Sequence, residues 1–189
     1  MKKRTAPRII AGKIRGKHLK SLPGNQTRPI TDRVKENLFN IIGSDIYDSK
    51  FLDAFAGTGS VGIEAYSRGA QFVQFVEKNQ KPYLILKENL ADISNSNAVS
   101  LIQTDAFKFL NSSIEQIFDY IYIAPPQYKQ MWKLALSNVD KNPKLLNSGG
   151  WMIVQIDPIE YITIQLDNFI EFDTRKYGST LLVFFTHKN

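Results

Sequence analysis

Cysteine is absent from the chain, and histidine occurs only twice, as His18 and His187. Without cysteine there can be no disulfide scaffold, no thiolate zinc site and no thiol nucleophile. Two histidines are also too few for a metal cluster built mainly from imidazole ligands. We therefore expect a protein that works without a bound metal ion.

Long apolar runs are also missing. No stretch approaches the ~20 consecutive apolar residues that a membrane helix requires, and the first eight residues, MKKRTAPR, lack the hydrophobic segment of a secretory signal. What is present is enough for one core, since 43% of the 189 residues are apolar and 12% are aromatic. We expect a single cytoplasmic domain, monomeric and without a membrane partner.

Positive charge is concentrated at the start of the sequence. Residues 1–36 contain eleven Lys and Arg against two acidic residues, whereas the rest of the chain carries a net negative charge. Such a concentration is typical of a protein that binds a polyanion, because each phosphate neutralised by Lys or Arg releases condensed counterions. Nucleic acid is the natural ligand, although a charged tail that only aids solubility would give the same composition.

Within this region, residues 8–19 interleave charges with apolar residues and glycine, in the order RIIAGKIRGKHL. That pattern predicts a short β-hairpin that turns near Lys13 to Lys17 and presents basic side chains on a fixed framework. We expect residues 1–30 to form a basic extension and residues 31–189 to form the main domain. The residues expected to contact RNA are Arg4, Arg8, Lys13, Arg15, Lys17, Arg28 and Arg33.

The rest of the chain alternates between strand-length apolar runs and helical patterns. Thr31 can cap a helix over about residues 31–43. Strands are predicted near residues 50–54, 72–76, 99–103, 119–123 and 150–154, and helices near 60–67, 79–91, 105–110 and 128–138. This alternation indicates parallel pairing with right-handed crossovers, and residues 169–176 and 180–186 predict a closing antiparallel hairpin. The expected fold class is α/β, a doubly wound, mostly parallel seven-stranded sheet with an N-terminal β-hairpin extension.

The first of these strands runs into a glycine-rich turn, DAFAGTGSVG, over residues 53–62. Glycines there allow a tight turn and a close approach of the backbone to a ligand, at the strand end where open sheets bind ligands. Glu77 ends the second strand, where a ribose diol would find an acceptor. Asp105 ends the third strand, where the amine of an adenine would find a hydrogen-bond acceptor. An acidic helix cap after each strand remains the alternative interpretation.

These residues predict an adenosine-type cofactor, either a nicotinamide dinucleotide or S-adenosylmethionine. A pyrophosphate needs a helix N-terminus without negative charge beside it. Asp53 precedes the turn and would repel that group, whereas it would suit a ligand that carries an ammonium and a sulfonium. Tyr83 and Lys87 have the spacing of a reductase pair, but they fall on a predicted surface helix away from the strand ends.

The fourth strand ends in a proline pair, within IAPPQY at residues 123–128. Two prolines cannot continue a sheet ladder, and they fix the turn so that its carbonyl groups face the strand-end cleft. Pro125 and Pro126 therefore mark the place expected for a second substrate, although any strand can stop at such a pair.

Three segments together resemble the bacterial small-subunit ribosomal RNA guanine-N2 methyltransferase family, an RsmD-like group of class I S-adenosylmethionine enzymes. They are RIIAGKIRG at residues 8–16, RPITDRVKENLF at 28–39 and LDAFAGTG at 52–59. The resemblance implies S-adenosylmethionine as cofactor, with residues 53–59 at its methionine portion, Glu77 at the ribose, Asp105 with Ala106 at the adenine edge, and RNA on the basic extension. The cofactor-binding residues expected are Asp53, Phe55, Gly57, Gly59, Glu77, Lys78, Asp105 and Ala106.

The chain departs from the family at the proline turn. Such amino-group methyltransferases carry Asp or Asn before the two prolines and an aromatic residue after them, whereas this chain has Ala124 and Gln127. The catalytic residues expected are Ala124, Pro125, Pro126 and Tyr128, with main-chain carbonyls as acceptors and Tyr128 as the ring that stacks on the base. Tyr122 is the substitute if the loop is shifted.

We therefore expect methyl transfer from S-adenosylmethionine to the exocyclic N2 amine of a guanine in small-subunit (16S) ribosomal RNA, free or within the assembling small subunit. The alternative is an RNA-binding or ribosome-assembly module that retains the fold and is catalytically impaired. Removing residues 1–20 should weaken RNA binding, flatten its salt dependence and leave cofactor affinity nearly unchanged.

Overall fold

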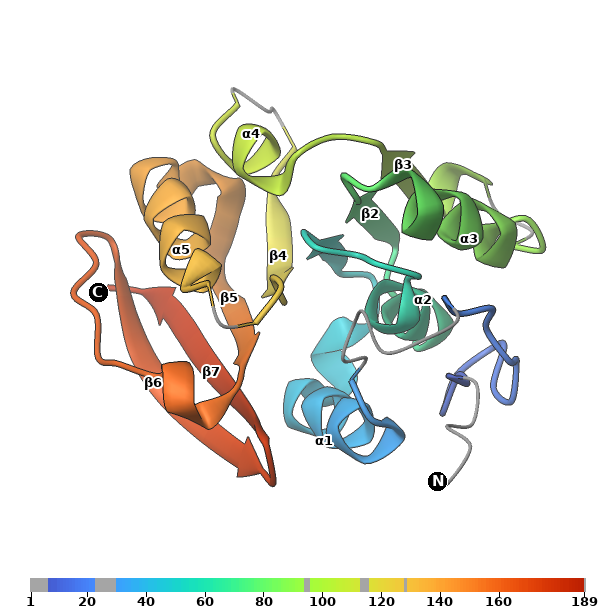
Figure 1. Cartoon of the computed structure of the whole chain (residues 1–189), viewed down its shortest axis with the longest axis horizontal. Helices are drawn as coiled ribbons and strands as arrows, with labels where there is room; N and C mark the ends of the chain where they lie inside the picture. Colours follow the sequence, from blue (N-terminus) through green and yellow to red (C-terminus); the bar gives the residue numbers. More distant parts are fainter. Residues whose placement is uncertain (1–6, 23–29, 94–95, 113–115, 128, 189) are drawn as a thin grey trace.

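A seven-stranded sheet forms the centre of the computed structural model, which describes residues 7–22, 30–93, 96–112, 116–127 and 129–188 (Figure 1). The strands are β1 (Lys50–Asp53), β2 (Phe72–Val76), β3 (Val99–Ile102), β4 (Phe118–Ile123), β5 (Leu146–Ile156), β6 (Phe169–Tyr177) and β7 (Thr180–His187). Their order is β3-β2-β1-β4-β5-β7-β6. The first five pair in parallel, and β7 is antiparallel to both β5 and β6, which confirms the expected doubly wound sheet and the closing hairpin.

Helices lie in the intervals where the sequence predicts them. They are α1 (Asp32–Ile42), α2 (Ser60–Ser67), α3 (Gln80–Leu90), α4 (Ala106–Leu110) and α5 (Met131–Lys141), with short 3-10 turns between some of them. Thr31 is the N-cap of α1, and its side-chain oxygen accepts a hydrogen bond from the Val34 amide at 3.4 Å. This cap satisfies one of the amide donors that the first helical turn leaves free.

The core has two parts, one on each face of the sheet. Phe51 and Leu52 are neighbours on β1, yet they belong to different apolar clusters, because successive side chains of a strand point to opposite faces. Residues of α1, α2 and α3 contribute to the cluster that contains Phe51, and residues of α4 and α5 contribute to the cluster that contains Leu52. Burial on both faces explains why the central strands read as continuous apolar runs.

The N-terminal segment, residues 7–22, turns back on itself, but its two arms are paired only briefly. One antiparallel bridge joins Arg8 to His18, and three backbone hydrogen bonds cross between the arms, from the amides of Ile9, Gly16 and Leu19 to the carbonyls of Lys17, Ile9 and Pro7. The turn is also bonded to α2: the Lys13 amide donates to the Ser67 carbonyl at 2.8 Å, and the Ile14 amide to the Ser67 hydroxyl at 3.2 Å.

Apolar residues of this segment are part of the main core. Ile9 and Leu19 are buried in the same cluster as residues of α1 and α2. Arg4 and Arg28, two of the residues expected to contact RNA, lie outside the described residues, as does Tyr128. Within the described ranges, no helix combines the length and the hydropathy needed to cross a bilayer. The same residues contain no group of three or more potential metal ligands.

Candidate cofactor and substrate site

The order in which the strands follow one another across the sheet reverses between β1 and β4. These two strands are neighbours although β2 and β3 separate them in the sequence. The two strands are parallel, with Asp53 opposite Tyr122, and the Ala54 amide donates to the Tyr122 carbonyl at 3.0 Å. The glycine turn and the proline turn therefore leave the sheet side by side. Open α/β sheets bind ligands at such a switch point, outside the carboxyl ends of the strands.

The glycine turn connects β1 to α2 in a backbone conformation that favours glycine. Gly57 and Gly59 have φ angles of 55° and 87°. A Cβ atom on Gly59 would lie 2.3 Å from the side chain of Leu86, whereas one on Gly57 would meet nothing within 4 Å. Glycine is thus favoured at residue 59 by the left-handed φ and by the close side chain of Leu86, and the space beside Gly57 lets a ligand approach the backbone.

Asp53 lies beneath this turn. Its side chain is 2% exposed, and one carboxylate oxygen accepts a hydrogen bond from the Gly62 amide at 3.0 Å. Burial raises the pKa of Asp53 to about 7, the charge of Glu77 adds to the rise, and the bond from Gly62 opposes it. The carboxyl group therefore supports the first turn of α2 and would act on a ligand mainly through its electric field.

Glu77 follows β2 and is bonded to the glycine turn. One carboxylate oxygen accepts from the Gly57 amide at 2.9 Å, and the other accepts from the Asn79 amide at 2.6 Å and its side chain at 3.1 Å. The residue is 8% exposed. These bonds fix the direction of the carboxylate. The oxygen bonded to Gly57 can accept one more hydrogen bond, whereas the other oxygen already has two donors, both from Asn79.

Asp105 has the helix-capping role that the sequence left open, and it also pairs with a lysine. It is the N-cap of α4, with one oxygen accepting from the Phe107 amide at 2.8 Å. The other oxygen forms an ion pair with Lys78 at 2.9 Å, and this contact lowers the pKa of the Asp105 carboxyl. Ala106 is buried directly after it. The structure thus brings Lys78 and Asp105 together across the ends of β2 and β3.

Two aromatic rings join the glycine turn to the start of α4. Phe55 and Phe107 meet edge to face, with ring centroids 5.6 Å apart, and both are half-buried. The cofactor-binding residues expected from the sequence include Phe55 but not Phe107. Phe107 could have been found from its position directly after Asp105 and Ala106, in the turn that follows β3. Together the rings form an apolar wall beside the three carboxyl groups.

The proline turn leaves β4 at the same sheet edge. Ala124 is half-buried against the core, Pro125 is buried and Pro126 is exposed. Tyr122 is not available as a stacking ring, which corrects the expectation for a shifted loop. Its side chain is buried, and its hydroxyl donates to the Gln155 side chain at 2.5 Å, pointing into the fold.

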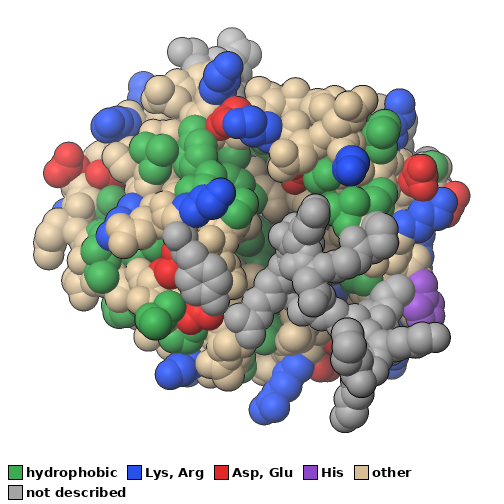
Figure 2. Space-filling model, in the orientation of Figure 1, with side chains coloured by type: hydrophobic (Ala, Val, Ile, Leu, Met, Phe, Trp, Pro, Cys, Tyr) green, Lys and Arg blue, Asp and Glu red, His purple; other side chains and the backbone are tan. Residues whose placement is uncertain are grey.

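Most of the basic side chains expected to contact RNA and described by the structure are exposed, and two of them form ion pairs. Arg8 forms an ion pair with Asp32 at 3.0 Å, and Lys17 forms one with Asp92 at 3.1 Å. Lys13 lies over the Tyr66 ring, while Arg15 and Arg33 are exposed. Figure 2 shows Lys and Arg side chains spread among apolar ones on the face that it draws. The ion pairs of Arg8 and Lys17 offset part of the positive charge of the described residues.

A separate surface cavity lies at the opposite edge of the sheet. It is lined by Asp45, Tyr47, Asp48, Ser49, Asp119, Tyr120, Ser148, Gly149 and Gly150. Asp119 holds the start of β1 there, because it accepts a hydrogen bond from the Lys50 amide at 2.7 Å. None of the residues predicted to bind cofactor or substrate lines this cavity.

Comparisons with known proteins agree with this arrangement. The chain is 39% identical over 137 residues to ribosomal RNA small subunit methyltransferase D of Haemophilus influenzae, covering 71% of each chain. It is 35% identical over 152 residues to a candidate rRNA methyltransferase of Bacillus subtilis, covering 79% of this chain and 82% of the relative. The solved structure of a candidate methylase from Haemophilus influenzae superposes on this chain with a TM-score of 0.81 at 30% identity. The match covers 96% of this chain and 98% of the other.

A family model described as Conserved hypothetical protein 95 matches residues 7–186, which is nearly the whole chain. The match includes the N-terminal segment as well as the sheet, so it extends beyond a shared methyltransferase fold. It confirms the resemblance found in the sequence. The chain therefore belongs to the RsmD family, whose model carries that description.

Proposed function

We propose that this chain transfers a methyl group from S-adenosylmethionine to the exocyclic N2 amine of a guanine in small-subunit ribosomal RNA. One observation carries the proposal: the Glu77 carboxylate, oriented by the amides of Gly57 and Asn79, stands beside the glycine turn at the switch point of the sheet. The relatives named as ribosomal RNA small subunit methyltransferase D support the choice of RNA as substrate.

The residues at this edge suit an adenosine cofactor. Glu77 can accept one ribose hydroxyl at the oxygen bonded to Gly57, and a second where that hydroxyl replaces the side chain of Asn79. The rings of Phe55 and Phe107 offer an apolar wall to a purine, next to the Asp105 carboxylate that could accept from its amine. When bound, S-adenosylmethionine supplies a methyl group on a sulfonium, which is a good leaving group.

Charge favours this cofactor over a nicotinamide dinucleotide. The turn over residues 53–62 contains no Lys or Arg, and the carboxyl groups of Asp53 and Glu77 lie beneath and beside it. The Lys35 ammonium bonded to Ser60 is already paired with Glu64, so a pyrophosphate at this place would meet mainly the two carboxyl groups, whereas an ammonium and a sulfonium would be attracted.

The proline turn supplies the proposed contacts to the base. Ala124 offers no side-chain acceptor, so the main-chain carbonyls of Ala124 and Pro125 would accept hydrogen bonds from the amine and direct its nitrogen lone pair. Tyr128 would stack on the base, which must leave its helix to reach the cofactor. Positioning of this kind can contribute up to ~7 to 11 kcal/mol, more than the ~3 to 4 kcal/mol usually lost with one preorganised polar partner.

Ala124 also supports a second candidate, a ribosome-assembly module that binds cofactor and RNA without efficient methyl transfer. A loss of ~10² to 10³ in rate is the usual effect of removing one such acceptor. The Ala124→Asp variant separates the two functions. Faster methyl transfer in the variant means that the native site lacks a needed acceptor. Slower transfer means that the main-chain carbonyls already position the amine and that the added carboxylate disturbs them.

The primary test is calorimetry of the full chain with S-adenosylmethionine. Glu77→Gln keeps the shape of the side chain and should weaken binding by about tenfold or more, because a charged acceptor of hydroxyl donors is lost. Glu88→Gln is the matched control, since Glu88 is an exposed glutamate on α3. No binding to the unmodified protein, or equal binding in both variants, would refute the cofactor assignment.

The substrate is tested in two steps. Small-subunit RNA and assembling particles from cells lacking this protein are incubated with the protein and radiolabelled cofactor, and the nucleosides are then analysed by mass spectrometry. N2-methylguanine is the expected product. Cofactor binding with no label in RNA favours the assembly module, and label on another nucleoside contradicts the proposed position.

A further inference from the structure

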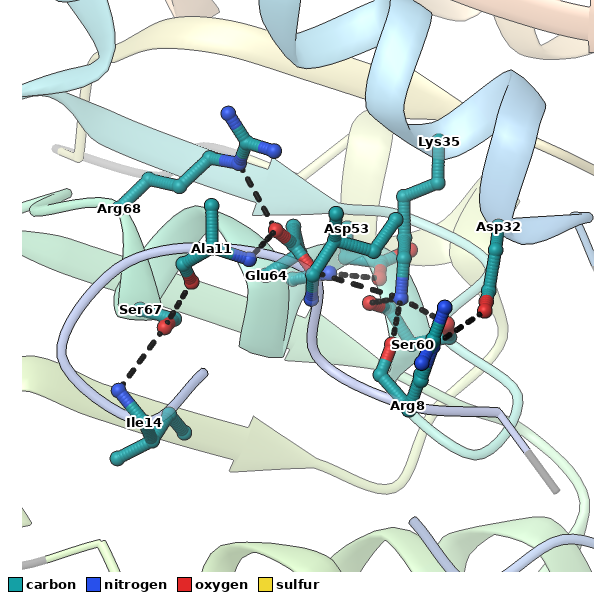
Figure 3. A network of polar contacts seen from close by, with 12 residues as sticks. Arg8, Ala11, Ile14, Asp32, Lys35, Asp53, Ser60, Glu64, Ser67 and Arg68 are labelled. Carbon is teal, nitrogen blue, oxygen red and sulfur yellow. Dashed lines mark hydrogen bonds and ion pairs between the residues drawn. The ribbon is translucent and has the colours of Figure 1, made fainter. Parts of the chain in front are cut away.

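The N-terminal segment and the glycine turn are held by the same buried side chains. Figure 3 shows Lys35 reaching from α1 toward residues of the N-terminal segment and of α2. A second residue, Asn89 on α3, makes a comparable set of contacts from another side. Neither residue belongs to the proposed cofactor or substrate contacts.

Lys35 is fully buried and its ammonium group has three kinds of partner. It donates to the main-chain carbonyl of Arg8 at 2.7 Å and to the hydroxyl of Ser60 at 3.1 Å, and it lies 3.5 Å from the Glu64 carboxylate. Ser60 is the first residue of α2, directly after Gly59. One side chain thus ties the N-terminal segment to the end of the glycine turn.

Glu64 fixes the next part of the segment. Its two carboxylate oxygens accept from the amides of Ile10 at 2.8 Å and Ala11 at 3.0 Å, and Arg68 adds an ion pair at 2.8 Å. The side chain is completely buried. Because the segment is bound through its backbone, its basic side chains remain free to point outward.

Asn89 makes the second connection. Its side-chain oxygen accepts from the Lys20 amide at 2.8 Å, and its side-chain nitrogen donates to the carbonyls of Lys20 at 3.0 Å and Thr58 at 2.9 Å. Thr58 lies between Gly57 and Gly59. The glycine turn is therefore attached to both ends of the docked segment, at Arg8 through Lys35 and at Lys20 through Asn89.

We propose that Lys35 and Asn89 are positioning residues which make the conformation of the glycine turn, and hence cofactor binding, depend on the docked residues 8–20. What the turn binds rests on the proposed function; the dependence of its conformation does not. These contacts argue against the expectation that residues 1–20 can be removed without effect on the cofactor. Removal would take the Arg8 carbonyl from Lys35 and the amides of Ile10 and Ala11 from Glu64, and buried charges that lose hydrogen-bond partners are costly.

Each positioning residue has a matched control. Lys35→Met removes one cation from Glu64 together with the contacts to Arg8 and Ser60, whereas Arg68→Met removes the other cation and leaves those contacts in place. Asn89→Leu breaks the link to Thr58. Glu88→Gln, one residue earlier, changes only an exposed ion pair with the Lys20 side chain.

Hydrogen exchange in the ligand-free full chain measures the turn itself. Lys35→Met and Asn89→Leu should speed the exchange of the amides of residues 57–62 by about tenfold, the effect of one lost hydrogen bond to a buried partner, and the controls should not. Affinity for S-adenosylmethionine should fall by a similar factor in the same two variants. Equal exchange in the variants and their controls would overturn the inference, whatever the cofactor result.

Ser60→Ala keeps the test decisive if Lys35→Met does not fold. It removes one acceptor of Lys35 and leaves its bond to Arg8, so the segment stays docked. In a double-mutant cycle with Lys35→Met, or with Lys35→Arg where only that variant folds, the effects on exchange should be clearly non-additive. Additive effects would contradict a connection through Ser60. Failure of the unmodified protein to bind S-adenosylmethionine would refute the proposed function alone, because the exchange measurement needs no ligand.

Discussion

Replacing Asp53 with asparagine should remove a pH dependence from the stability of the protein. The Asp53 carboxyl is buried under the glycine turn, and its pKa is raised from 3.8 to about 7. An amide of the same shape keeps an acceptor for the Gly62 amide but cannot ionise. The variant therefore isolates the effect of the negative charge from that of the hydrogen bond.

The sign follows from proton binding. Between pH 3.8 and about 7 the folded chain holds the Asp53 proton and the unfolded chain does not. The folded state binds more protons, so the free energy of unfolding falls as the pH rises through this window and becomes level above it. The difference between the two pKa values corresponds to about 4 kcal/mol once the carboxyl is ionised.

Urea denaturation at pH 4, 5, 6, 7 and 8 measures the effect. Relative to the unmodified protein, the asparagine variant should gain up to about 4 kcal/mol in the free energy of unfolding between pH 4 and pH 8. Burying the amide donors adds a constant cost of about 1 to 3 kcal/mol at every pH. That constant shifts the curve without changing its slope. Asp92→Asn, at a highly exposed carboxylate, should reproduce the slope of the unmodified protein.

Cofactor binding should respond in the opposite way, because a ligand with an ammonium and a sulfonium binds the ionised form of Asp53 more tightly. Affinity for S-adenosylmethionine should rise between pH 5 and 7 in the unmodified protein and stay level in Asp53→Asn. If the free energies of unfolding of the two proteins change with pH in parallel, ionisation of Asp53 does not destabilise the fold. That result would refute the argument that the charge of this buried carboxyl is maintained at a cost in stability.

Three further predictions concern the segment, the core and the RNA surface. Gly12 and Gly16 have the same left-handed φ, but a Cβ on Gly12 would lie 1.8 Å from the Ser67 carbonyl oxygen and one on Gly16 would meet nothing. Gly16→Ala should lower the free energy of unfolding by about 1–2 kcal/mol, and Gly12→Ala should lower it by clearly more; thermal unfolding of both variants measures this. Phe118→Ala, at a fully buried position, should cost about 3–5 kcal/mol in urea denaturation. Arg15→Ala should lower the salt dependence of RNA binding by about one phosphate contact in a filter-binding titration, and an unchanged slope would exclude Arg15 from the interface.

The sheet could be predicted because its signals are local. The apolar run at residues 72–76 is bounded by polar residues, and its strand begins and ends at the predicted positions. Thr31 marks the start of α1 through a cap that depends only on its neighbours. Strand ends also predict where side chains meet, because parallel strands finish at one edge. Asp53, Glu77 and Asp105 could therefore be assigned to one site before their contacts were known.

The contacts that hold the N-terminal segment could not be predicted in this way. Lys35 reaches Arg8 across 27 positions and Ser60 across 25, and Asn89 reaches Lys20 across 69. In the sequence Lys35 reads as one more basic residue of a charged region, because composition does not distinguish a buried ammonium from an exposed one. The attachment of the turn to α2 could not be predicted for the same reason, since the amides of Lys13 and Ile14 find their acceptors on a helix that is distant in the sequence.

The three carboxyl groups of the proposed cofactor site are each bonded to backbone amides of the chain itself. Asp53 accepts from Gly62, Glu77 accepts from Gly57, and Asp105 accepts from Phe107. These bonds fix the direction of the carboxyl groups before any ligand arrives, so binding does not have to order them, and preorganisation of this kind raises affinity. It also links the acceptors to the glycine turn. A change that loosens the turn would misalign Asp53 and Glu77 together, which is why residues as remote from the ligand as Lys35 and Asn89 should affect cofactor binding.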